Sequence, residues 1–214
     1  MTLRCAGLIA SLFALLGCDV DARTNVPVQP TLSTTTNAPE LGQLGIFPSK
    51  RFGVELPLPN DEPWSIDDRT TPWLTASQGD HSTVLLRLWP SENRMNRDKC
   101  EAQARDKRTL PLREGSELLD IFEAVEPAGF DTIAEVRVAP QPDGRLFGFV
   151  LAFGGSGRRC FAYVFATSDR SPSKDRVIAD RLAITMERSF RKLRFSRDTE
   201  VDLTGPPALP PPSQ

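Results

Sequence analysis

Two apolar segments joined by a glycine-rich turn constrain the fold of this chain more than any other feature. The segments are Leu146–Phe153 and Cys160–Ala166, and Gly154-Gly155-Ser156-Gly157 follows the first of them. Because glycine supplies positive φ values at a tight reversal, this stretch predicts a β-hairpin. Nearly every position of both segments is apolar, so neither face of the hairpin is polar. We therefore expect both strands at the centre of a sheet that is covered on both sides.

Alternation along the hairpin predicts two unlike faces. Large residues are expected on one face: Phe147, Phe149, Leu151, Phe153, Phe161, Tyr163 and Phe165. Small residues are expected on the other face: Gly148, Val150, Ala152, Cys160, Ala162, Val164 and Ala166. Each apolar face then needs its own cover.

Two segments with helical spacing can supply these covers. The first spans about residues 91–107, where Ser91 is a suitable N-cap and Cys100 and Ala104 lie one turn apart. The second spans about residues 172–192 and has proline at its first helical position. Its apolar residues recur at helical spacing: Ile178, Leu182, Met186, Phe190 and Leu193.

Shorter segments elsewhere in the chain predict the remaining strands. They lie at 52–56, 73–76, 83–89, 118–125 and 132–138. Together with the hairpin and the two helices, they predict an α+β fold in which an antiparallel β-sheet of about six to seven strands is covered by two helices. This α/β/α sandwich is expected to occupy residues 46–198.

The beginning of the expected domain carries a family pattern. Phe52-Gly53-Val54, then Pro57 and Pro63-Trp64, resemble the opening strand-and-tryptophan pattern of PsbP-like domains. The similarity covers about residues 46–198 and implies an antiparallel α/β/α sandwich. It also implies a non-enzymatic role, because such domains mostly serve as extrinsic, partner-binding or assembly factors, although a fold does not define a function.

The first eighteen residues predict export. Arg4 precedes an apolar run, Cys5–Leu16, that is too short for a transmembrane helix, which needs about 20 residues. A charged start, a short apolar core and a small residue before a cleavage site are typical of a secretory signal peptide. Because Leu15-Leu16-Gly17 leads into Cys18, the segment resembles the lipobox of bacterial lipoproteins.

The lipobox resemblance implies that residues 1–17 are removed and that Cys18 is acylated. Several acyl chains hold a protein stably on a bilayer. We therefore expect a lipoprotein of the bacterial cell envelope, with the outer membrane favoured and the periplasmic or surface-exposed side left open. An ordinary cleaved signal peptide and an uncleaved anchor are the alternatives.

Polar and proline-rich segments flank the expected domain. Residues 18–45 predict a disordered tether, because they contain too few apolar residues to offset the entropy of ordering. Residues 199–214 predict a Pro-rich disordered tail with polyproline II character. The tether is expected to lift the domain off the lipid surface.

Two of the four cysteines belong to the expected domain, since Cys5 lies in the signal segment and Cys18 at the predicted anchor. In an oxidising compartment Cys100 and Cys160 are expected to form one disulfide between the first helix and the central hairpin. The alternative, a pair of free thiols for redox or metal chemistry, lacks a CxxC spacing and a nearby histidine.

Charge and motifs argue against several function classes. The chain has 26 basic and 28 acidic residues, so no basic excess indicates nucleic-acid binding. The sequence contains no P-loop, dinucleotide-binding fingerprint, EF-hand loop or HExxH motif, and no cofactor or metal site is predicted. His81, the only histidine, falls at a predicted turn and is expected to be a solvated loop residue.

Tryptophans and arginines are the candidate binding residues. The candidate binding surface consists of Trp64, Trp73, Trp89, Arg158 and Arg159. The tryptophans either form an exposed interface or close the edge of the core beside their neighbouring prolines. The two arginines, together with Arg145, either form a small anion site or keep the turn soluble.

These observations predict a lipid-anchored envelope lipoprotein whose domain is a non-enzymatic binding or assembly-accessory module. Its expected partners are the membrane, through the anchor, and another envelope protein. One alternative is an envelope hydrolase that uses acidic residues in a cleft, for which Asp67-Asp68 and the pair Glu123 and Glu126 are available. Another is a purely structural lipoprotein.

Overall fold

The computed structural model describes residues 44–195. The predicted signal segment, Cys18, most of the predicted tether and the predicted proline-rich tail lie outside the described residues. The strands are β1 Leu44–Ser49, β2 Val54–Pro59, β3 Ser65–Asp67, β4 Leu74–Gln78, β5 Ser82–Pro90, β6 Glu117–Ala124, β7 Asp131–Pro140, β8 Leu146–Ser156, β9 Arg159–Asp169 and β10 Arg194–Phe195. The helices are α1 Arg97–Lys107 and α2 Lys174–Ile184, and α2 continues through a π turn, Thr185–Ser189, and a 3-10 turn, Phe190–Lys192.

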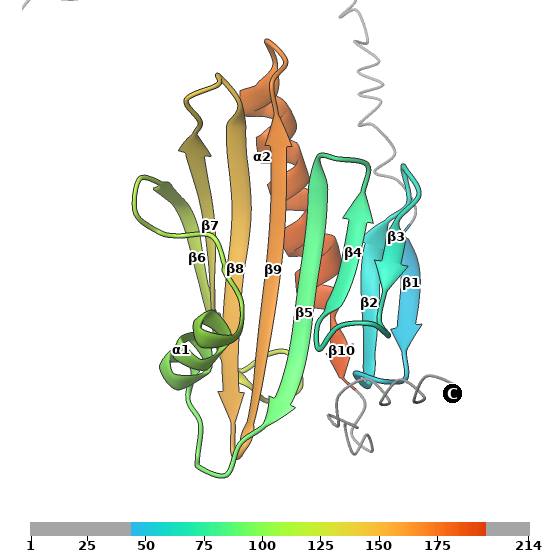
Figure 1. The fold of residues 1–214 in the computed structure, drawn as a ribbon, viewed down its shortest axis with the longest axis vertical. Coiled ribbons are helices and arrows are strands. Elements are labelled where there is room, and N and C mark those ends of the chain that lie inside the picture. Colours follow the sequence, from blue (N-terminus) through green and yellow to red (C-terminus); the bar gives the residue numbers. More distant parts are fainter. Residues whose placement is uncertain (1–43, 196–214) are drawn as a thin grey trace, which may run out of the picture. The chain divides into compact units, whose positions relative to one another are not determined.

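Within residues 44–195 the strands form two antiparallel sheets (Figure 1). The larger sheet has seven strands in the order β3-β4-β5-β9-β8-β7-β6, which confirms the predicted α+β class and strand number. The smaller sheet has the order β1-β2-β10. This second sheet was not predicted: the strand expected at 52–56 corresponds to β2, which pairs with β1 and β10 instead of joining the larger sheet.

The hairpin of β8 and β9 lies at the centre of the larger sheet, as predicted, but its faces differ from the prediction. β8 runs to Ser156 and β9 begins at Arg159, so the loop has two residues. Phe153 consequently lies opposite Ala162. An even-numbered loop places odd positions of one strand beside even positions of the other, so each face combines large residues of one strand with small residues of its partner. The predicted separation into a large and a small face is therefore wrong.

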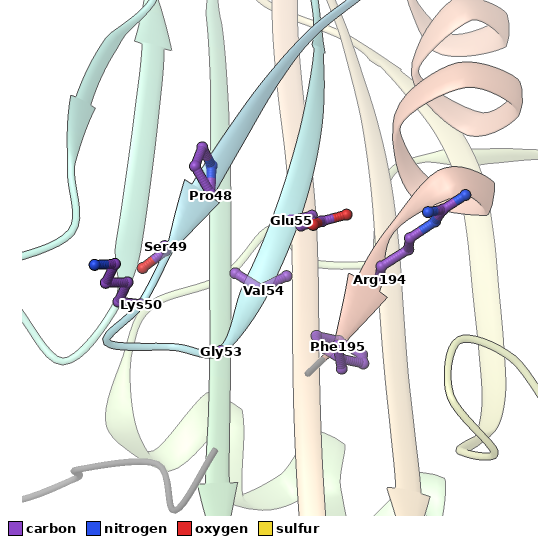
Figure 2. A pocket seen from close by; sticks show the side chains of 8 residues that line it. All are labelled: Pro48, Ser49, Lys50, Gly53, Val54, Glu55, Arg194 and Phe195. Carbon is purple, nitrogen blue, oxygen red and sulfur yellow. The ribbon is translucent and has the colours of Figure 1, made fainter. Parts of the chain in front are cut away.

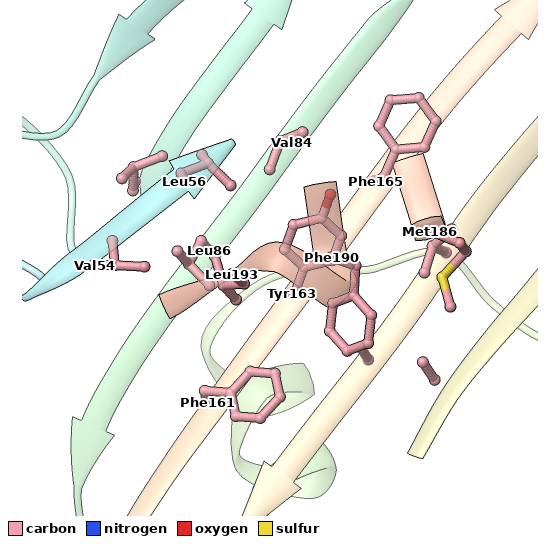
Figure 3. Packing of buried hydrophobic residues seen from close by; sticks show 14 of the residues in the cluster. Val54, Leu56, Val84, Leu86, Phe161, Tyr163, Phe165, Met186, Phe190 and Leu193 are labelled. Carbon is pink, nitrogen blue, oxygen red and sulfur yellow. The ribbon is translucent and has the colours of Figure 1, made fainter. Parts of the chain in front are cut away.

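A hydrophobic core lies on each face of the larger sheet. One core lies between the sheet and both α2 and β2, and it includes Val54, Leu56, Phe161, Tyr163, Phe165, Met186 and Phe190 (Figure 3). The other core lies beneath α1 and includes Phe149, Leu151, Phe153, Cys100, Ala104, Trp73 and Trp89. Each helix covers one face, as predicted, and the smaller sheet shares one of the faces with α2.

Two glycines of β8 allow both helices to approach the sheet closely. On one face, a Cβ atom at Gly148 would lie 2.5 Å from Cγ2 of Ile178 on α2. On the other face, a Cβ atom at Gly155 would lie 2.6 Å from the carbonyl carbon of Asn96, the N-cap of α1. Cβ atoms do not approach other atoms so closely, so the small residues of β8 set the distance between the sheet and its covers.

The first helix begins later than predicted. Its N-cap is Asn96, whose side-chain oxygen accepts a hydrogen bond from the backbone N–H of Lys99 at 3.0 Å, whereas Ser91 was the expected cap. Asparagine is as good an N-cap as serine, so residue type did not distinguish the two positions. Among residues 44–195, no helix is long and apolar enough to cross a membrane.

Candidate functional site

A disulfide joins α1 to β9, as the sequence predicts. The Sγ atoms of Cys100 and Cys160 are bonded, and the two Cα atoms lie 5.4 Å apart. Both cysteines are fully buried in the core beneath α1. The bond therefore ties that helix to the centre of the larger sheet. Cys18 lies outside the described residues, so its acylation stays a prediction.

Two of the three tryptophans of the candidate binding surface are buried. Trp73 and Trp89 are 2% and 4% exposed, and both pack in the core beneath α1. Trp89 donates its indole N–H to Gln103 of α1 at 2.8 Å. Trp64 is half-buried against the other core and donates its indole N–H to the carbonyl of Pro59 at 2.8 Å. The tryptophans therefore pack against two cores on opposite faces of the larger sheet and do not form one exposed surface.

The arginines of the candidate surface lie apart from Arg145. Arg158 and Arg159 are exposed at the turn between β8 and β9. Arg145 directly precedes β8, whose 11 residues separate it from that turn, and it forms an ion pair with Asp143 at 2.7 Å. The three arginines occupy opposite ends of the hairpin, so they do not form a common anion site.

His81 is held in a polar cluster and is not simply solvated. Its Nε2 lies 3.1 Å from Glu62 Oε2, and its Nδ1 lies 2.9 Å from Ser82 Oγ. Ser82 in turn donates to Thr167 Oγ1, which also accepts a hydrogen bond from Arg181 of α2. The neighbouring cavity has a volume of about 50 Å³, enough for about one or two water molecules. This cluster therefore fastens the β4–β5 turn to its neighbours. A wider depression of about 420 Å³ lies on another side of His81, and Arg145 and Arg181 also line it.

The two acidic pairs considered for a hydrolase do not form a common site. Asp67 accepts hydrogen bonds from the hydroxyl and backbone N–H of Thr70 and from the N–H of Arg69, which lower the pKa of Asp67 to about 2. Asp67 ends β3 and Glu123 lies on β6, and these two strands form opposite edges of the larger sheet. The two pairs therefore do not face each other. In the described part of the chain, no group of three His, Cys, Asp or Glu side chains could hold a metal ion.

A shallow depression lies between β1, β2 and β10 (Figure 2). Its volume is about 510 Å³, and its charged lining residues are Lys50, Glu55 and Arg194. Figure 2 shows Lys50 pointing away from Glu55 and Arg194, which are register partners on β2 and β10. Ligand pockets usually bring a few polar groups to one point, so this depression does not have the character of a built ligand site.

Exposed apolar side chains concentrate around β6. The large hydrophobic residues exposed among residues 44–195 are Ile46, Leu112, Leu118, Leu119, Ile121 and Val125. All of them except Ile46 lie between residues 112 and 126, a segment named here the β6 surface. Single exposed apolar residues are ordinary, whereas a cluster indicates an interaction surface. The β6 surface is therefore the candidate functional site.

The β6 surface also contains an open sheet edge. β6 has eight residues and forms one edge of the larger sheet, while β3 at the other edge has only three. A long edge strand leaves backbone N–H and C=O groups free to pair with another chain. A bulge between Leu118 and Asp120 interrupts the pairing with β7, but residues 120–124 pair regularly. Along this edge the Ile121 N–H donates to the Asp120 side chain at 2.8 Å, so the other edge groups of residues 120–124 are the ones that a further strand could pair with.

The charge of the β6 surface is acidic. Its carboxylates are all exposed: Glu114, Glu117, Asp120, Glu123 and Glu126. No Lys or Arg occurs between residues 114 and 126, although Arg97 of α1 pairs with Glu123 at 3.2 Å. An acidic surface favours partners that carry basic residues and disfavours acidic ones.

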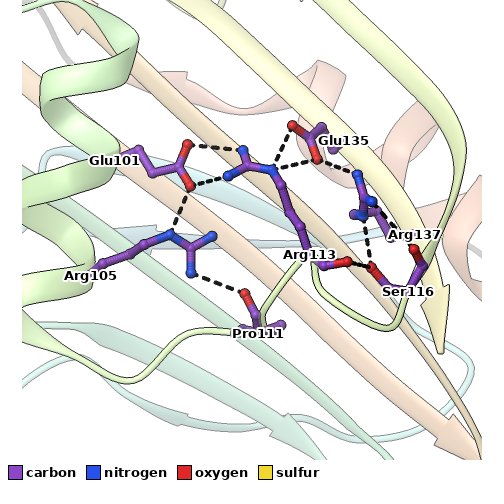
Figure 4. Close-up of polar contacts among 7 residues, drawn as sticks. All are labelled: Glu101, Arg105, Pro111, Arg113, Ser116, Glu135 and Arg137. Carbon is purple, nitrogen blue, oxygen red and sulfur yellow. Dashed lines mark hydrogen bonds and ion pairs between the residues drawn. The ribbon is translucent and has the colours of Figure 1, made fainter.

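An ionic network holds the segment that leads into β6 (Figure 4). Arg113 donates from Nη2 to Glu101 of α1 at 2.9 Å and from Nε to Glu135 of β7 at 2.8 Å. Arg137 donates to the same Glu135 at 2.8 Å and to the hydroxyl of Ser116 at 2.9 Å. The network spans α1, the connecting loop and β7, so it anchors the loop immediately before the open edge.

The carboxylates of this network are stabilised in their ionised form. Burial raises the pKa of Glu101, but hydrogen bonds from Arg113 and Arg105 lower it by more, so the pKa lies below its ordinary value. Burial likewise raises the pKa of Glu135, and Arg113 and Arg137 outweigh that effect. The hydrogen bonds to both carboxylates raise the pKa of Arg113. All of these groups therefore stay charged near neutral pH.

No family model matches the chain, and no curated protein matches it. Similar solved structures include a protein from Bacteroides thetaiotaomicron, with 12% identity and a TM-score of 0.41. The match covers 74% of this chain and 50% of that chain, so this chain spans half the length of that protein. Another is the cyanobacterial PsbP protein (CyanoP) of Synechocystis sp. PCC 6803. It has 9% identity and a TM-score of 0.41, and the match covers 74% of this chain and 95% of that chain. A protein of unknown function from Pseudomonas aeruginosa has 13% identity and a TM-score of 0.33. That match covers 68% of this chain and 95% of that chain.

Proposed function

We propose that this protein is a lipid-anchored, non-enzymatic domain of the bacterial envelope that binds a partner protein through the β6 surface. In this proposal Cys18 carries the lipid anchor, with the outer membrane favoured, and residues 112–126 present the binding face. The polar clusters around His81 and Arg113 act within the fold, which supports a binding role over a catalytic one.

The concentration of exposed apolar residues on an open edge strand carries this proposal. Leu119 and Ile121 are each 49% exposed and Val125 is 69% exposed. Leaving such side chains in water costs free energy that burial against a partner recovers, at about 25 cal/mol for each Å² of apolar surface. Natural edge strands usually protect themselves by shortness, charge or bulges, and β6 combines its bulge and charges with apolar residues. A surface of this kind suits selective docking.

The occupant we propose is an extended segment of a second protein that carries Lys or Arg among apolar residues. Such a segment pairs its backbone with residues 120–124, packs apolar side chains against Leu119 and Ile121, and brings its basic side chains to the surrounding carboxylates. A second copy of this chain fits less well. Antiparallel pairing of two β6 strands would bring the carboxylates of one copy against those of the other.

Site-specific photo-crosslinking in the native envelope tests the proposed function. The full chain carries a photoreactive amino acid either at Leu119 or at Ile46, a similarly exposed apolar residue on β1. We expect a discrete product from position 119 that is absent from position 46. Mass spectrometry of the product should place the crosslink in an extended, basic segment of the partner. The same products from both positions, or a crosslink to another copy of this chain, would contradict the proposal.

Matched substitutions sharpen this test. Leu119→Asp adds a charge to the proposed contact and should abolish the crosslink from a probe at Ile121, whereas Ile46→Asp should leave it unchanged. Raising the salt concentration should weaken the product, because ionic strength screens the attraction between the acidic surface and a basic segment. A product that survives both Leu119→Asp and high salt would place the partner elsewhere.

A further inference from the structure

A small apolar groove lies between β1 and β3, the edge strands of the two sheets (Figure 1). Its volume is about 210 Å³. None of its lining residues is charged, which distinguishes it from the depression beside β10 and from the acidic β6 surface. The apolar lining residues are Ile46, Phe47, Leu58, Pro59, Trp64 and Ile66.

Two aromatic rings form part of the groove wall. Trp64 and Phe47 are each half-buried, so part of each side chain faces solvent. The indole N–H of Trp64 donates to the carbonyl of Pro59 at 2.8 Å, which holds the ring at the groove. Ile46, on the same groove, is 63% exposed. Aromatic-lined grooves bind proline-rich segments, because the polyproline II helix is already ordered before it binds.

The groove also offers a hydrogen-bond donor to such a segment. Asn60 lines the groove and is exposed, and its side chain makes no hydrogen bond with any of residues 44–195. A polyproline II segment has no internal hydrogen bonds, so its backbone carbonyls are free to accept one from the Asn60 amide.

The chain itself contains a segment of matching chemistry. Five of the seven residues 206–212 are proline, and Pro207 and Pro210 have the PxxP spacing that aromatic-lined grooves recognise. Residues 203–214 carry no charged side chain, so they match a groove without charges and lack the basic residues proposed for the partner of β6. The predicted tether has one pair of the same spacing, Pro27 and Pro30, but a lower proline density and therefore less polyproline II preference.

The connection between this segment and the domain is long enough. Phe195 of β10 pairs with Val54 of β2, and Leu58 at the groove lies four residues farther along β2. At about 3.4 Å for each residue, this separation is about 14 Å. The ten residues 196–205 span at most about 33–36 Å when extended. The surplus allows the chain to turn back, since β10 runs antiparallel to β2 and so away from Leu58.

We propose that residues 206–212 dock in the groove between β1 and β3 as a polyproline II segment and pack against Trp64. The docked segment covers apolar side chains that otherwise face water. Its covalent connection to β10 keeps it at a high effective concentration near the groove. The groove lies at the β3 edge of the larger sheet and the β6 surface at the opposite edge, so this docking does not depend on partner binding at β6.

Nuclear magnetic resonance of the chain carrying Cys18→Ser tests the docking, because each tryptophan gives one indole N–H signal. The tail variant Pro207→Ala/Pro210→Ala is compared with the tether variant Pro27→Ala/Pro30→Ala, which removes a pair of the same spacing. We expect the Trp64 signal to move in the tail variant and to stay in place in the tether variant. The signals of the two tryptophans buried beneath α1 report that the fold is intact.

A synthetic peptide of residues 203–214 completes the test. Added to the tail variant, it should return the Trp64 signal saturably to its original position, and the same peptide with alanine at 207 and 210 should not. Ile46→Asp places a charge at the groove and should weaken peptide binding to the tail variant at least tenfold. Leu112→Asp, at a residue that is 64% exposed and lies outside the groove, should leave this binding unchanged.

Three results would overturn the proposal. One is a Trp64 signal that does not move in the tail variant, or a peptide that binds equally well to the Ile46→Asp and Leu112→Asp chains. Another is an equal movement in the tether variant, which would assign the groove to the tether. The third is a Trp64 position that depends on protein concentration, which would assign the groove to the tail of a second copy.

Discussion

Gly155 of β8 lies directly against the backbone of Asn96, the residue that caps α1. A Cβ atom at position 155 would stand 2.6 Å from the carbonyl carbon and 2.7 Å from the Cα atom of Asn96. Gly155 is also the register partner of Cys160, which is bonded to Cys100 of the same helix. The glycine and the disulfide therefore position the same helix on the same part of the sheet.

Gly155→Ala should lower the free energy of unfolding by about 1–3 kcal/mol, the usual cost of overpacking. The clash involves backbone atoms, so no side-chain rotation relieves it. Urea denaturation measures the change. Gly45→Ala is the control, because its Cβ atom would meet its nearest neighbour at an ordinary 3.7 Å. Equal effects of the two substitutions would show that α1 does not depend on this close approach.

Removing the disulfide should destabilise the domain by about 4 kcal/mol in the loop-closure account. The bond closes a loop with a sequence separation of 60 residues. Urea denaturation of the double variant Cys100→Ala/Cys160→Ala measures the loss. A reductant should lower the stability of the unsubstituted protein in the same way and leave the double variant unchanged. Alkylation of both thiols without reductant would contradict the disulfide.

The ionic network around Arg113 should make stability depend on acid pH. The pKa values of Glu101 and Glu135 lie below their ordinary value of 4.5 in the folded state. Below pH 4.5 the unfolded chain therefore takes up protons more readily than the folded chain. The stabilisation is complete above the ordinary pKa and is lost as the pH falls through the lowered folded values.

Glu135→Gln tests this pH dependence. The substitution weakens charge-assisted hydrogen bonds, so at pH 7 it should cost about 2 kcal/mol. The difference in the free energy of unfolding between this variant and the unsubstituted protein should shrink as the pH falls from 6 to 3. Urea denaturation at each pH measures it. Glu92→Gln, in an exposed carboxylate that forms no ion pair with the described residues, should show no such convergence. Parallel curves for Glu135→Gln and the unsubstituted protein would rule out the network as the source.

Cys18→Ser should release the protein from membranes into the soluble fraction. The substitution removes the thiol that acylation requires, and an exported domain without acyl chains has no anchor. Fractionation of cells followed by immunoblotting measures the distribution. Ala22→Ser, which changes the tether and leaves Cys18 intact, is the control. Continued membrane retention of the Cys18→Ser protein would contradict the lipoprotein interpretation.

Local sequence patterns predict most of the secondary structure and the layers of this fold. The apolar hairpin at 146–166 indicates a sheet covered on both sides, and the helical spacing around Cys100 and Leu182 identifies the covers. The disulfide also follows from the cysteine count together with the predicted export. Each of these features depends on residues that are close in sequence or on composition alone.

The candidate site was only partly accessible from the sequence. The strand expected at 118–125 corresponds to β6, which ends at Ala124, but nothing in its pattern shows that the strand forms an edge. That property depends on which strands pair, and pairing is set by contacts between segments distant in sequence. The tryptophans were the more obvious candidates because aromatic residues are enriched at interfaces, yet burial places Trp73 and Trp89 in the core.

What the amino-acid sequence specifies here is the set of elements, their apolar character and the chemistry available at each position. Tertiary structure decides the register of β8 against β9, the separate sheet of β1, β2 and β10, and the place of β6 at the edge of the larger sheet. The physical reason is that periodicity reports only how neighbouring residues face a strand or helix. Loop length, strand pairing and close packing then determine which of those faces meet.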